Sequence, residues 1–186
     1  LGKSVIQGVL SYAGKSIAII RDGRPTMAAG LVDSRDYTIT QPGNVPLTTR
    51  RFSLIDVPDL KLMAAHWPQA SEVWFSVGTA PTVMLKVLNK FARLVQGKLL
   101  RSISFLTPVV NWVVNSLRWG EHRGGMFVRL YGRDVAGGLC RRRWHMIAEG
   151  KNGPYVPVMA VAAVIGRCLE GMPPEPGARP ALHELE

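Results

Sequence analysis

The sequence predicts an α+β fold, in which a mixed or largely antiparallel sheet carries helices packed on one face. The composition is that of a globular chain, because 47% of the 186 residues are hydrophobic and 19% are charged. Helical and hairpin patterns alternate along the chain, and few strand–helix–strand units are present to build a parallel sheet. A chain of this length can bury a core without disulfides or metals.

The first elements expected are a short helix and a β-hairpin. Ser4 suits a helix N-cap, and Gly14 suits the residue at which that helix ends. Residues 17–20 are apolar and rich in β-branched side chains, Asp22-Gly23 is a turn pair, and residues 26–32 can form the returning strand.

Residues 33–49 are polar and contain two prolines, which predicts a loop. Short strands are expected at residues 51–56 and 72–77. A helix over residues 81–96 follows, with one polar stripe and one apolar stripe at helical spacing. The polar stripe comprises Lys86, Asn89, Lys90 and Arg93, and the apolar stripe comprises Met84, Val87, Leu88, Phe91, Leu94 and Val95.

A second helical stretch covers residues 99–117, and Pro108 is expected to kink or split it. Residues 126–133 and 139–148 then predict a β-hairpin with a glycine-rich turn. Alternation places Arg141, Arg143 and His145 on one side of its second strand. Residues 156–170 form an almost wholly apolar helix, which is normally buried.

The charge and the missing motifs exclude several classes of protein. The two cysteines, Cys140 and Cys168, lack the spacing of a metal site, and a disulfide framework is not expected, so a reducing cytoplasm is the default location. Neither GxGxxG nor GxxxxGK[ST] occurs, so the chain alone is not expected to bind a dinucleotide or triphosphate in those ways.

The net charge is +10, and the basic residues are scattered along the chain except at Arg141–Arg143. Alternation along a strand places these three arginines on two faces, which argues against nucleic acid as a partner.

Four segments, taken together and in this order, resemble the C-terminal part of bacterial saccharopine dehydrogenase-like oxidoreductases. They are residues 56–60 (DVPDL), 123–130 (RGGMFVRL), 144–157 (WHMIAEGKNGPYVP) and 176–180 (PGARP). The resemblance covers most of the chain and is strongest from Trp119 to Pro180. Residues 1–180 then form the substrate-side domain, and residues 181–186 form a tail, partly vector-derived. The start at Leu1, without an initiator Met, is typical of a cut or processed chain.

This resemblance implies a protein that transfers hydride only with a further, N-terminal dinucleotide-binding domain. That domain would hold NAD or NADP, and this chain would hold a small anionic substrate and offer a homodimer surface through its sheet. No metal is expected. The resemblance gives neither the substrate nor the direction of the reaction.

Several residues are candidates for the substrate side of the cleft. Arginine can grip a carboxylate with two hydrogen bonds, and glycines allow a backbone to approach a ligand closely, which selects Arg123, Gly124 and Gly125. The start of the last helix offers backbone N–H groups to an anion, which selects Gly153 and Tyr155. The remaining candidates are His122 as a proton carrier, Asp56 for a substrate amine, and Arg179 in the tail.

An alternative is a module without catalysis that binds a membrane surface or another protein. Residues 83–95 and 99–117 are amphipathic, and the first of these stretches carries a basic stripe. Neither is apolar enough for a transmembrane span. Packing of both helices on the sheet explains the same pattern.

Overall fold

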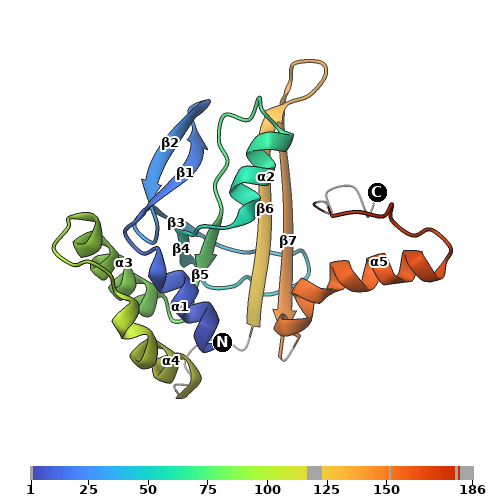
Figure 1. Cartoon of the computed structure of the whole chain (residues 1–186). Helices are drawn as coiled ribbons and strands as arrows, with labels where there is room; N and C mark the ends of the chain where they lie inside the picture. The colour runs from blue at the N-terminus through green and yellow to red at the C-terminus, as the bar shows by residue number, and fades with distance from the viewer. Residues whose placement is uncertain (1, 117–122, 151, 179, 181–186) are drawn as a thin grey trace. The chain divides into compact units, whose positions relative to one another are not determined.

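The structure, a computed structural model, describes residues 2–116, 123–150, 152–178 and 180 (Figure 1). It confirms the α+β class, and its strands form three small antiparallel sheets instead of one. The chain divides into two compact units. Unit 1 comprises Leu1–Thr38 and Thr49–Glu121, and unit 2 comprises Ile39–Thr48 and His122–Glu186.

Unit 1 opens with the predicted helix and hairpin. Helix α1 covers Lys3–Ser11, and strands β1 (Ser16–Arg21) and β2 (Arg24–Ala29) pair antiparallel. Asp22 and Gly23 form the turn with φ angles of 53° and 70°. Two consecutive left-handed residues are the conformation that a two-residue hairpin turn favours, so the Asp-Gly pair predicted this turn correctly.

The second sheet of unit 1 has the strand order β3–β4–β5, formed by Ser34–Tyr37, Arg50–Leu54 and Ser76–Gly78. The prediction of a loop at residues 33–49 was wrong at β3. That strand lacks an apolar alternation, and its pairing is supported by polar cross-strand contacts instead. Arg51 Nε donates to Asp36 at 3.0 Å, and the hydroxyls of Ser34 and Ser53 are 2.9 Å apart. The strand predicted at 72–77 is also shorter, because Val73 forms only an isolated bridge with Ile20.

The helices of unit 1 are α2 (Pro58–His66), α3 (Thr82–Gln96) and α4 (Thr107–Ser116), with a 3-10 turn η1 at Ser104–Leu106. Pro108 lies in the first turn of α4, where its missing N–H costs no helical hydrogen bond. The helix expected over residues 99–117 therefore begins at Thr107, one residue before the proline, and Pro108 does not lie in its interior.

Helix α3 turns a different face to the core than its stripes predicted. Its buried residues are Leu85, Leu88, Asn89 and Ala92. Asn89, assigned to the polar stripe, is only 3% exposed, whereas Val87 from the apolar stripe is 46% exposed. Asn89 was assigned to the exposed stripe because its side chain is polar. The sequence does not show that polar partners for this side chain lie inside unit 1.

The core of unit 1 consists of two clusters of buried side chains. One joins α1, Leu31 and α3 through Leu10, Leu85 and Leu88, and the other joins β1 to Leu54 and Leu60. Gly14 lets the end of α1 meet α3 closely, since a Cβ there would lie 2.3 Å from the Ala92 carbonyl oxygen, and its φ is 72°. Only glycine accepts both conditions.

Asn89 connects the elements of unit 1 through hydrogen bonds. Its amide donates to the Leu31 carbonyl, and the same nitrogen lies 2.9 Å from the Ser53 hydroxyl. Leu31 is fully buried and has a φ of 58°, a conformation that costs a leucine about 1–3 kcal/mol. The backbone N–H of Leu31 donates to Leu54 at 2.9 Å, so this residue is held from both sides.

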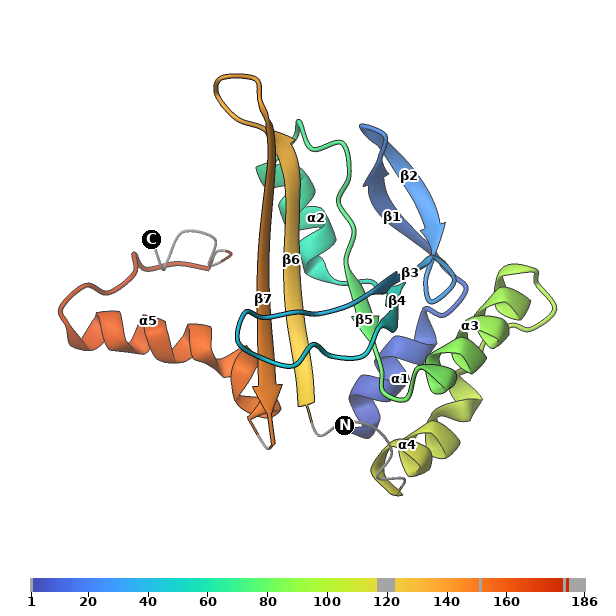
Figure 2. The same ribbon diagram turned by 180° about the vertical axis from the view of Figure 1, so that it is seen from behind.

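Unit 2 is built on the predicted long hairpin, β6 (Arg123–Arg133) and β7 (Leu139–Glu149), which forms a two-stranded sheet. The segment 39–48 crosses this hairpin (Figure 2). Ile39 and Leu47 of that segment are buried, at 3% and 1% exposure. They occupy the space beside Gly125, where a Cβ would lie 2.9 Å from Leu47 Cδ1.

The last helical stretch is divided and exposed. A 3-10 turn η2 (Gly153–Val158) precedes helix α5 (Met159–Leu169), which is drawn orange in Figure 1. The prediction that this apolar stretch is buried was wrong, because none of the described residues of α5 is buried. Apolar composition predicts burial only where a covering surface exists, and the described part of the chain supplies none for α5.

Replacing Asn89 by alanine is expected to lower the free energy of unfolding by about 2–4 kcal/mol, since the Leu31 carbonyl and the Ser53 hydroxyl lose a buried partner and a small cavity forms. Lys90→Ala on the exposed side of α3 is the control and should change it by less than about 0.5 kcal/mol. Urea denaturation measures both. Equal effects of the two substitutions would show that the Asn89 contacts do not stabilise unit 1.

Candidate functional site

The strand register gives the β6–β7 hairpin two chemically different faces. Phe127 pairs with His145, Arg129 with Arg143, and Tyr131 with Arg141. Directly opposed residues share a face of a sheet, so these six side chains lie together. We call this the basic face: Phe127, Arg129, Tyr131, Arg133, Leu139, Arg141, Arg143 and His145. The other side, here the apolar face, carries Met126, Val128, Leu130, Cys140, Arg142, Trp144 and Met146.

At the base of the hairpin Arg123 holds the segment 39–48. Its guanidinium donates to the carbonyl oxygens of Val45 at 2.7 Å and Pro46 at 3.5 Å. These two bonds hold the guanidinium at this end of the hairpin. The predicted role of Arg123, gripping a substrate carboxylate, requires a ligand to approach beside these two carbonyls.

The two glycines beside Arg123 have different surroundings. At Gly125, the side chains of Ile39 and Leu47 occupy the space that a Cβ would need. Its lack of a side chain is thus explained by packing of segment 39–48. Gly124 has no atom within 4 Å of the position of a Cβ, so its side of the strand is open.

The helix start expected to offer N–H groups is the 3-10 turn η2. It packs against both strands of the hairpin, and Glu149, which pairs with Arg123, precedes Gly153 by only four residues. Arg123, Gly124 and η2 therefore lie at the same end of the hairpin. The backbone N–H of Tyr155 already donates to Asn152 at 3.0 Å, and its side chain is 65% exposed.

His145 lies further along the basic face and contacts the backbone of Thr40. Its Nδ1 is 3.0 Å from the Thr40 nitrogen and 2.5 Å from the Thr40 oxygen. Its Nε2 is buried and has no hydrogen-bond partner among the described residues. Thr40 thus fixes the ring at one nitrogen, and the aromatic ring of Phe127 packs edge-on at 6.1 Å.

The other sequence candidates do not join this site. Asp56 belongs to unit 1, where it follows β4 and lies near Tyr12. Burial is the main cause that raises the pKa of Tyr12 to about 12, and the negative charge of Asp56 adds to it, whereas a hydrogen bond to the Asp56 backbone acts in the opposite direction. His122 and Arg179 lie outside the described residues.

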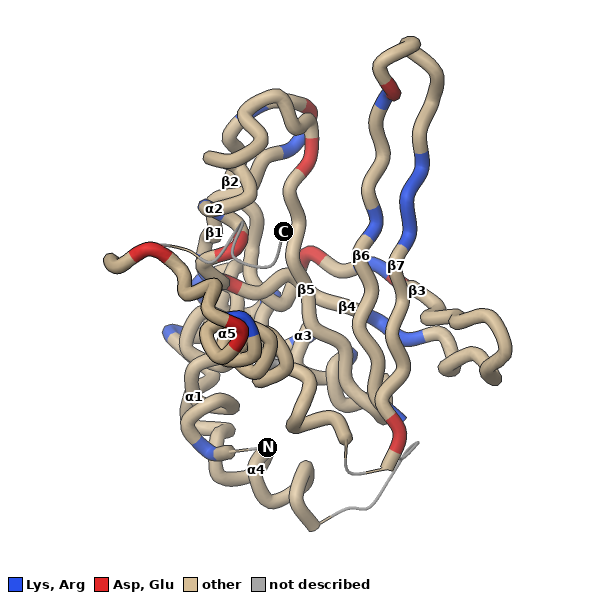
Figure 3. The backbone as a smooth tube through the Cα atoms, turned by 90° about the vertical axis from the view of Figure 1, so that its right-hand side faces the viewer, with Lys and Arg blue, Asp and Glu red and all other residues tan. Residues whose placement is uncertain are grey.

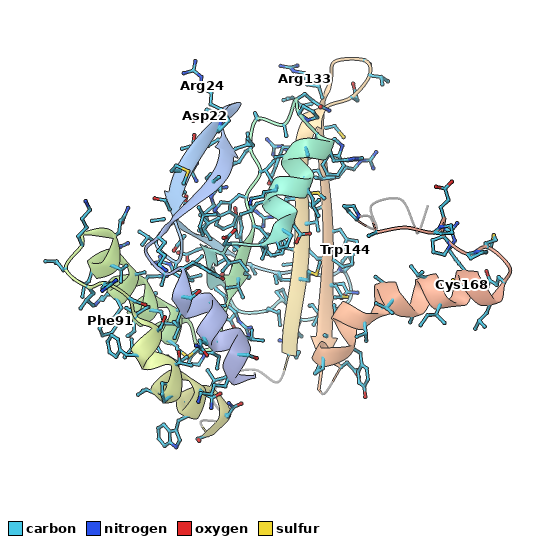
Figure 4. The ribbon with its side chains drawn as sticks, in the orientation of Figure 1. Asp22, Arg24, Phe91, Arg133, Trp144 and Cys168 are labelled. Carbon is cyan, nitrogen blue, oxygen red and sulfur yellow. The ribbon has the colours of Figure 1, made fainter. Side chains whose placement is uncertain are left out.

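Unit 1 contains a pocket of about 580 Å³ that the sequence analysis did not find. It lies between α3 and α4 and is lined almost entirely by apolar side chains, among them Val87, Phe91 and Val109. Figure 4 shows Phe91 on α3. Thr79 also lines it, and the hydroxyl of this residue is buried without a hydrogen-bond partner among the described residues. The sequence shows only that the stretch of α3 contains several valines, and this does not indicate a pocket.

Within the described part of the chain, no group of three or more histidine, cysteine or carboxylate side chains could hold a metal ion. Likewise, the described helices include none of the length and apolarity needed to cross a bilayer. Cys140 and Cys168 are free thiols (Figure 4 labels Cys168).

Comparison with known proteins gives no relative: no family model, no curated protein and no solved structure matches this chain.

The raised pKa of Tyr12 predicts a loss of stability in alkaline solution. In the unfolded chain the phenol ionises near 10.0, whereas in the folded chain it does so near 12. The folded form therefore loses stability as the pH rises from about 10 to about 12, because only the unfolded phenol releases its proton there. The wild type should therefore lose unfolding free energy relative to Tyr12→Phe over this range, because phenylalanine has no proton to release. A constant difference would contradict the raised pKa.

Proposed function

We propose that this chain is the substrate-side domain of an NAD(P)-dependent oxidoreductase that resembles saccharopine dehydrogenase, and that it works when joined to a dinucleotide-binding domain. The observation that carries this proposal is the apolar surface that unit 2 leaves in contact with water. The resemblance of the four sequence segments supplies the class of reaction.

Helix α5 is the clearest part of that surface. Met159, Val161, Ile165 and Leu169 are 61%, 58%, 54% and 84% exposed. The apolar face of the hairpin adds Val128, Leu130 and Trp144, at 42%, 56% and 49%, and Figure 4 shows Trp144 on β7. Apolar surface of this extent on a helix and a sheet is typical of an interface.

The energies agree with a partner domain of substantial size. Burying one large apolar side chain contributes roughly 1.5–3 kcal/mol, whereas association costs about 4–15 kcal/mol in lost freedom of motion. The four side chains of α5 alone would barely offset that cost. A domain that covers more than α5, or one that is covalently linked, would associate firmly.

The substrate side would lie at the base of the hairpin. Arg123 would provide a positive charge for an anionic substrate, and the open side of Gly124 would allow close approach. The backbone of η2 would complete the site from the same end of the hairpin. NAD or NADP, held by the partner domain, would supply the hydride chemistry when bound. The pocket of unit 1 does not suit this substrate, because its lining residues include no lysine, arginine or histidine.

The experiment compares variants of the protein that contains both this chain and a dinucleotide-binding domain. Ile165→Asp is expected to lower NAD(P)H-dependent turnover of small amino acids or 2-oxo acids at least tenfold, since a charge would enter the interface. Met27→Asp is the control, because Met27 is similarly exposed, at 61%, on a strand of unit 1. The melting temperature of the isolated chain should not change with Ile165→Asp. Turnover unaffected by this substitution would exclude α5 from the interface.

The same assay tests the substrate site through Arg123→Ala. The expected result is a fall in kcat/KM of at least tenfold, mostly through KM, because a lost charge weakens substrate binding. Arg24→Ala, an exposed arginine at the turn of β1 and β2 (Figure 4), is the control. An unchanged kcat/KM would remove Arg123 from the site. Absence of any NAD(P)H binding by the joined protein would refute the oxidoreductase proposal.

The pocket between α3 and α4 favours a second candidate, a protein-interaction module without catalysis. The two amphipathic stretches that suggested such a module line this pocket together. Its volume and lining would accept apolar side chains presented by a helix of another protein. The basic residues Lys86, Lys90 and Arg93 remain exposed on α3 and would favour an acidic partner or an anionic membrane surface.

Val109→Asp tests whether this pocket accepts apolar groups. Val109 is 58% exposed and lines the pocket, so a carboxylate there should at least halve the fluorescence of a bound apolar dye such as ANS. Val5→Asp makes the same chemical change at 53% exposure outside the pocket, and it should leave the fluorescence unchanged. Equal fluorescence of both variants would show that the dye binds elsewhere. Pelleting of the wild type with anionic liposomes would instead favour a membrane surface.

A further inference from the structure

The arginines of the basic face form a patch that the linear sequence conceals. Arg141–Arg143 alternate between the two faces of β7, which separates Arg142 from its neighbours. Pairing across the hairpin then brings Arg129 opposite Arg143, and Arg133 follows on the same side. Within residues 127–133 and 139–145, four arginines thus lie on the basic face and one on the apolar face. Figure 3 shows the basic residues gathered in the half of the hairpin nearer its turn.

Nearby groups on the hairpin orient three of these guanidinium groups. The Arg129 guanidinium lies 5.4 Å from the centre of the Phe127 ring, and that of Arg141 lies 5.9 Å from the Tyr131 ring. Arg133 donates to the Gly137 carbonyl at 2.9 Å. Residues 127–133 and 139–145 include no aspartate or glutamate. Asp134, in the turn, accepts hydrogen bonds from the N–H groups of Ala136 and Gly138.

We propose that the basic face of the β6–β7 hairpin binds the phosphate backbone of nucleic acid without reading its sequence. This goes beyond the proposed oxidoreductase function and does not depend on it. Arginine suits phosphate because its planar guanidinium can donate two hydrogen bonds to one phosphate group. A ribbon of two strands also has the width that the major groove of a duplex admits.

The exposure of the face selects a polyanion over a small ion. Arg141 and Arg143 are exposed, and an exposed ion pair contributes only about 0–1 kcal/mol. One phosphate or carboxylate would therefore be held weakly on this open ribbon. A phosphate backbone meets several arginines at once, and release of its condensed counterions adds to the binding.

The unequal distribution of arginines argues against a membrane as the polyanion. A hairpin that dips its turn into a bilayer would gain from charges on both faces, since lipid headgroups would surround it. Of the five arginines in residues 127–133 and 139–145, four share one face, and the opposite face exposes Val128, Leu130 and Trp144. Contact of one flat face with a rigid polyanion fits this arrangement better.

The experiment measures fluorescence anisotropy of a labelled duplex of about 20 base pairs, and of one of its strands, titrated with the whole chain. Arg133, Arg141 and Arg143 are exposed. Three phosphate contacts predict a slope of about −2 to −3 in the plot of log K against log salt concentration, so affinity should fall roughly twentyfold to fiftyfold from 50 to 200 mM salt. Two unrelated sequences should bind equally, and the duplex should show the steeper salt dependence.

Arg143→Ala and Arg142→Ala form a matched pair, because they remove the same charge from neighbouring residues on opposite faces. Arg143→Ala should weaken binding severalfold and make the salt slope shallower by about 1, and the double variant Arg141→Ala/Arg143→Ala by about 2. Arg142→Ala should leave the slope unchanged. Circular dichroism and thermal melting confirm that the variants remain folded.

Three results would overturn the proposal. Equal losses from Arg142→Ala and Arg143→Ala would show only general attraction to a chain of net charge +10. No binding at 50 mM salt would exclude a nucleic-acid site. Binding to vesicles that contain anionic phosphatidylserine, without binding to either oligonucleotide, would identify a membrane surface instead.

Discussion

The hydrogen bonds of Asn89 are the constraint on which unit 1 depends. Its amide reaches the carbonyl of Leu31, a fully buried residue with a left-handed backbone, and the hydroxyl of Ser53 on β4. One side chain of α3 thereby joins the end of the first hairpin to the second sheet. Without this partner, a buried carbonyl and a buried hydroxyl would lose hydrogen bonds. The position of α3 also sets one wall of the apolar pocket.

Unit 2 depends on a different constraint, the close packing of segment 39–48 on the hairpin. Its two buried residues, Ile39 and Leu47, sit against Gly125, and any larger residue there would displace them. Arg123 and His145 add hydrogen bonds to the same segment. A two-stranded hairpin is marginal in water by itself, so this cover supplies most of the burial that unit 2 has.

Sequence patterns predicted those elements whose formation depends on neighbouring residues in the chain. The Asp22-Gly23 turn, the bounds of α3 and the long hairpin all follow from turn residues and periodicity within a few positions. The sequence could not predict β3 or the burial of Asn89, because each depends on partners distant along the chain. It could not predict the exposure of α5 either, because exposure depends on how the other described residues fold and not on the composition of the helix. The candidate site was likewise predicted only in part. Arg123, Gly124 and η2 share one end of the hairpin, whereas the role of Gly125 depends on Ile39 and Leu47, which lie in a segment taken for a simple loop.

The hairpin shows why a register carries more functional information than a strand pattern. Alternation alone placed Arg141 and Arg143 on one side of β7 and supported the conclusion that no basic patch forms. Pairing with β6 adds Arg129 to that side and places Met126, Val128 and Trp144 on the other. One ribbon can therefore present charge to one partner and apolar surface to another. A surface for domain docking and a surface for a polyanion can then coexist on unit 2, because the two strands sort their side chains by chemistry.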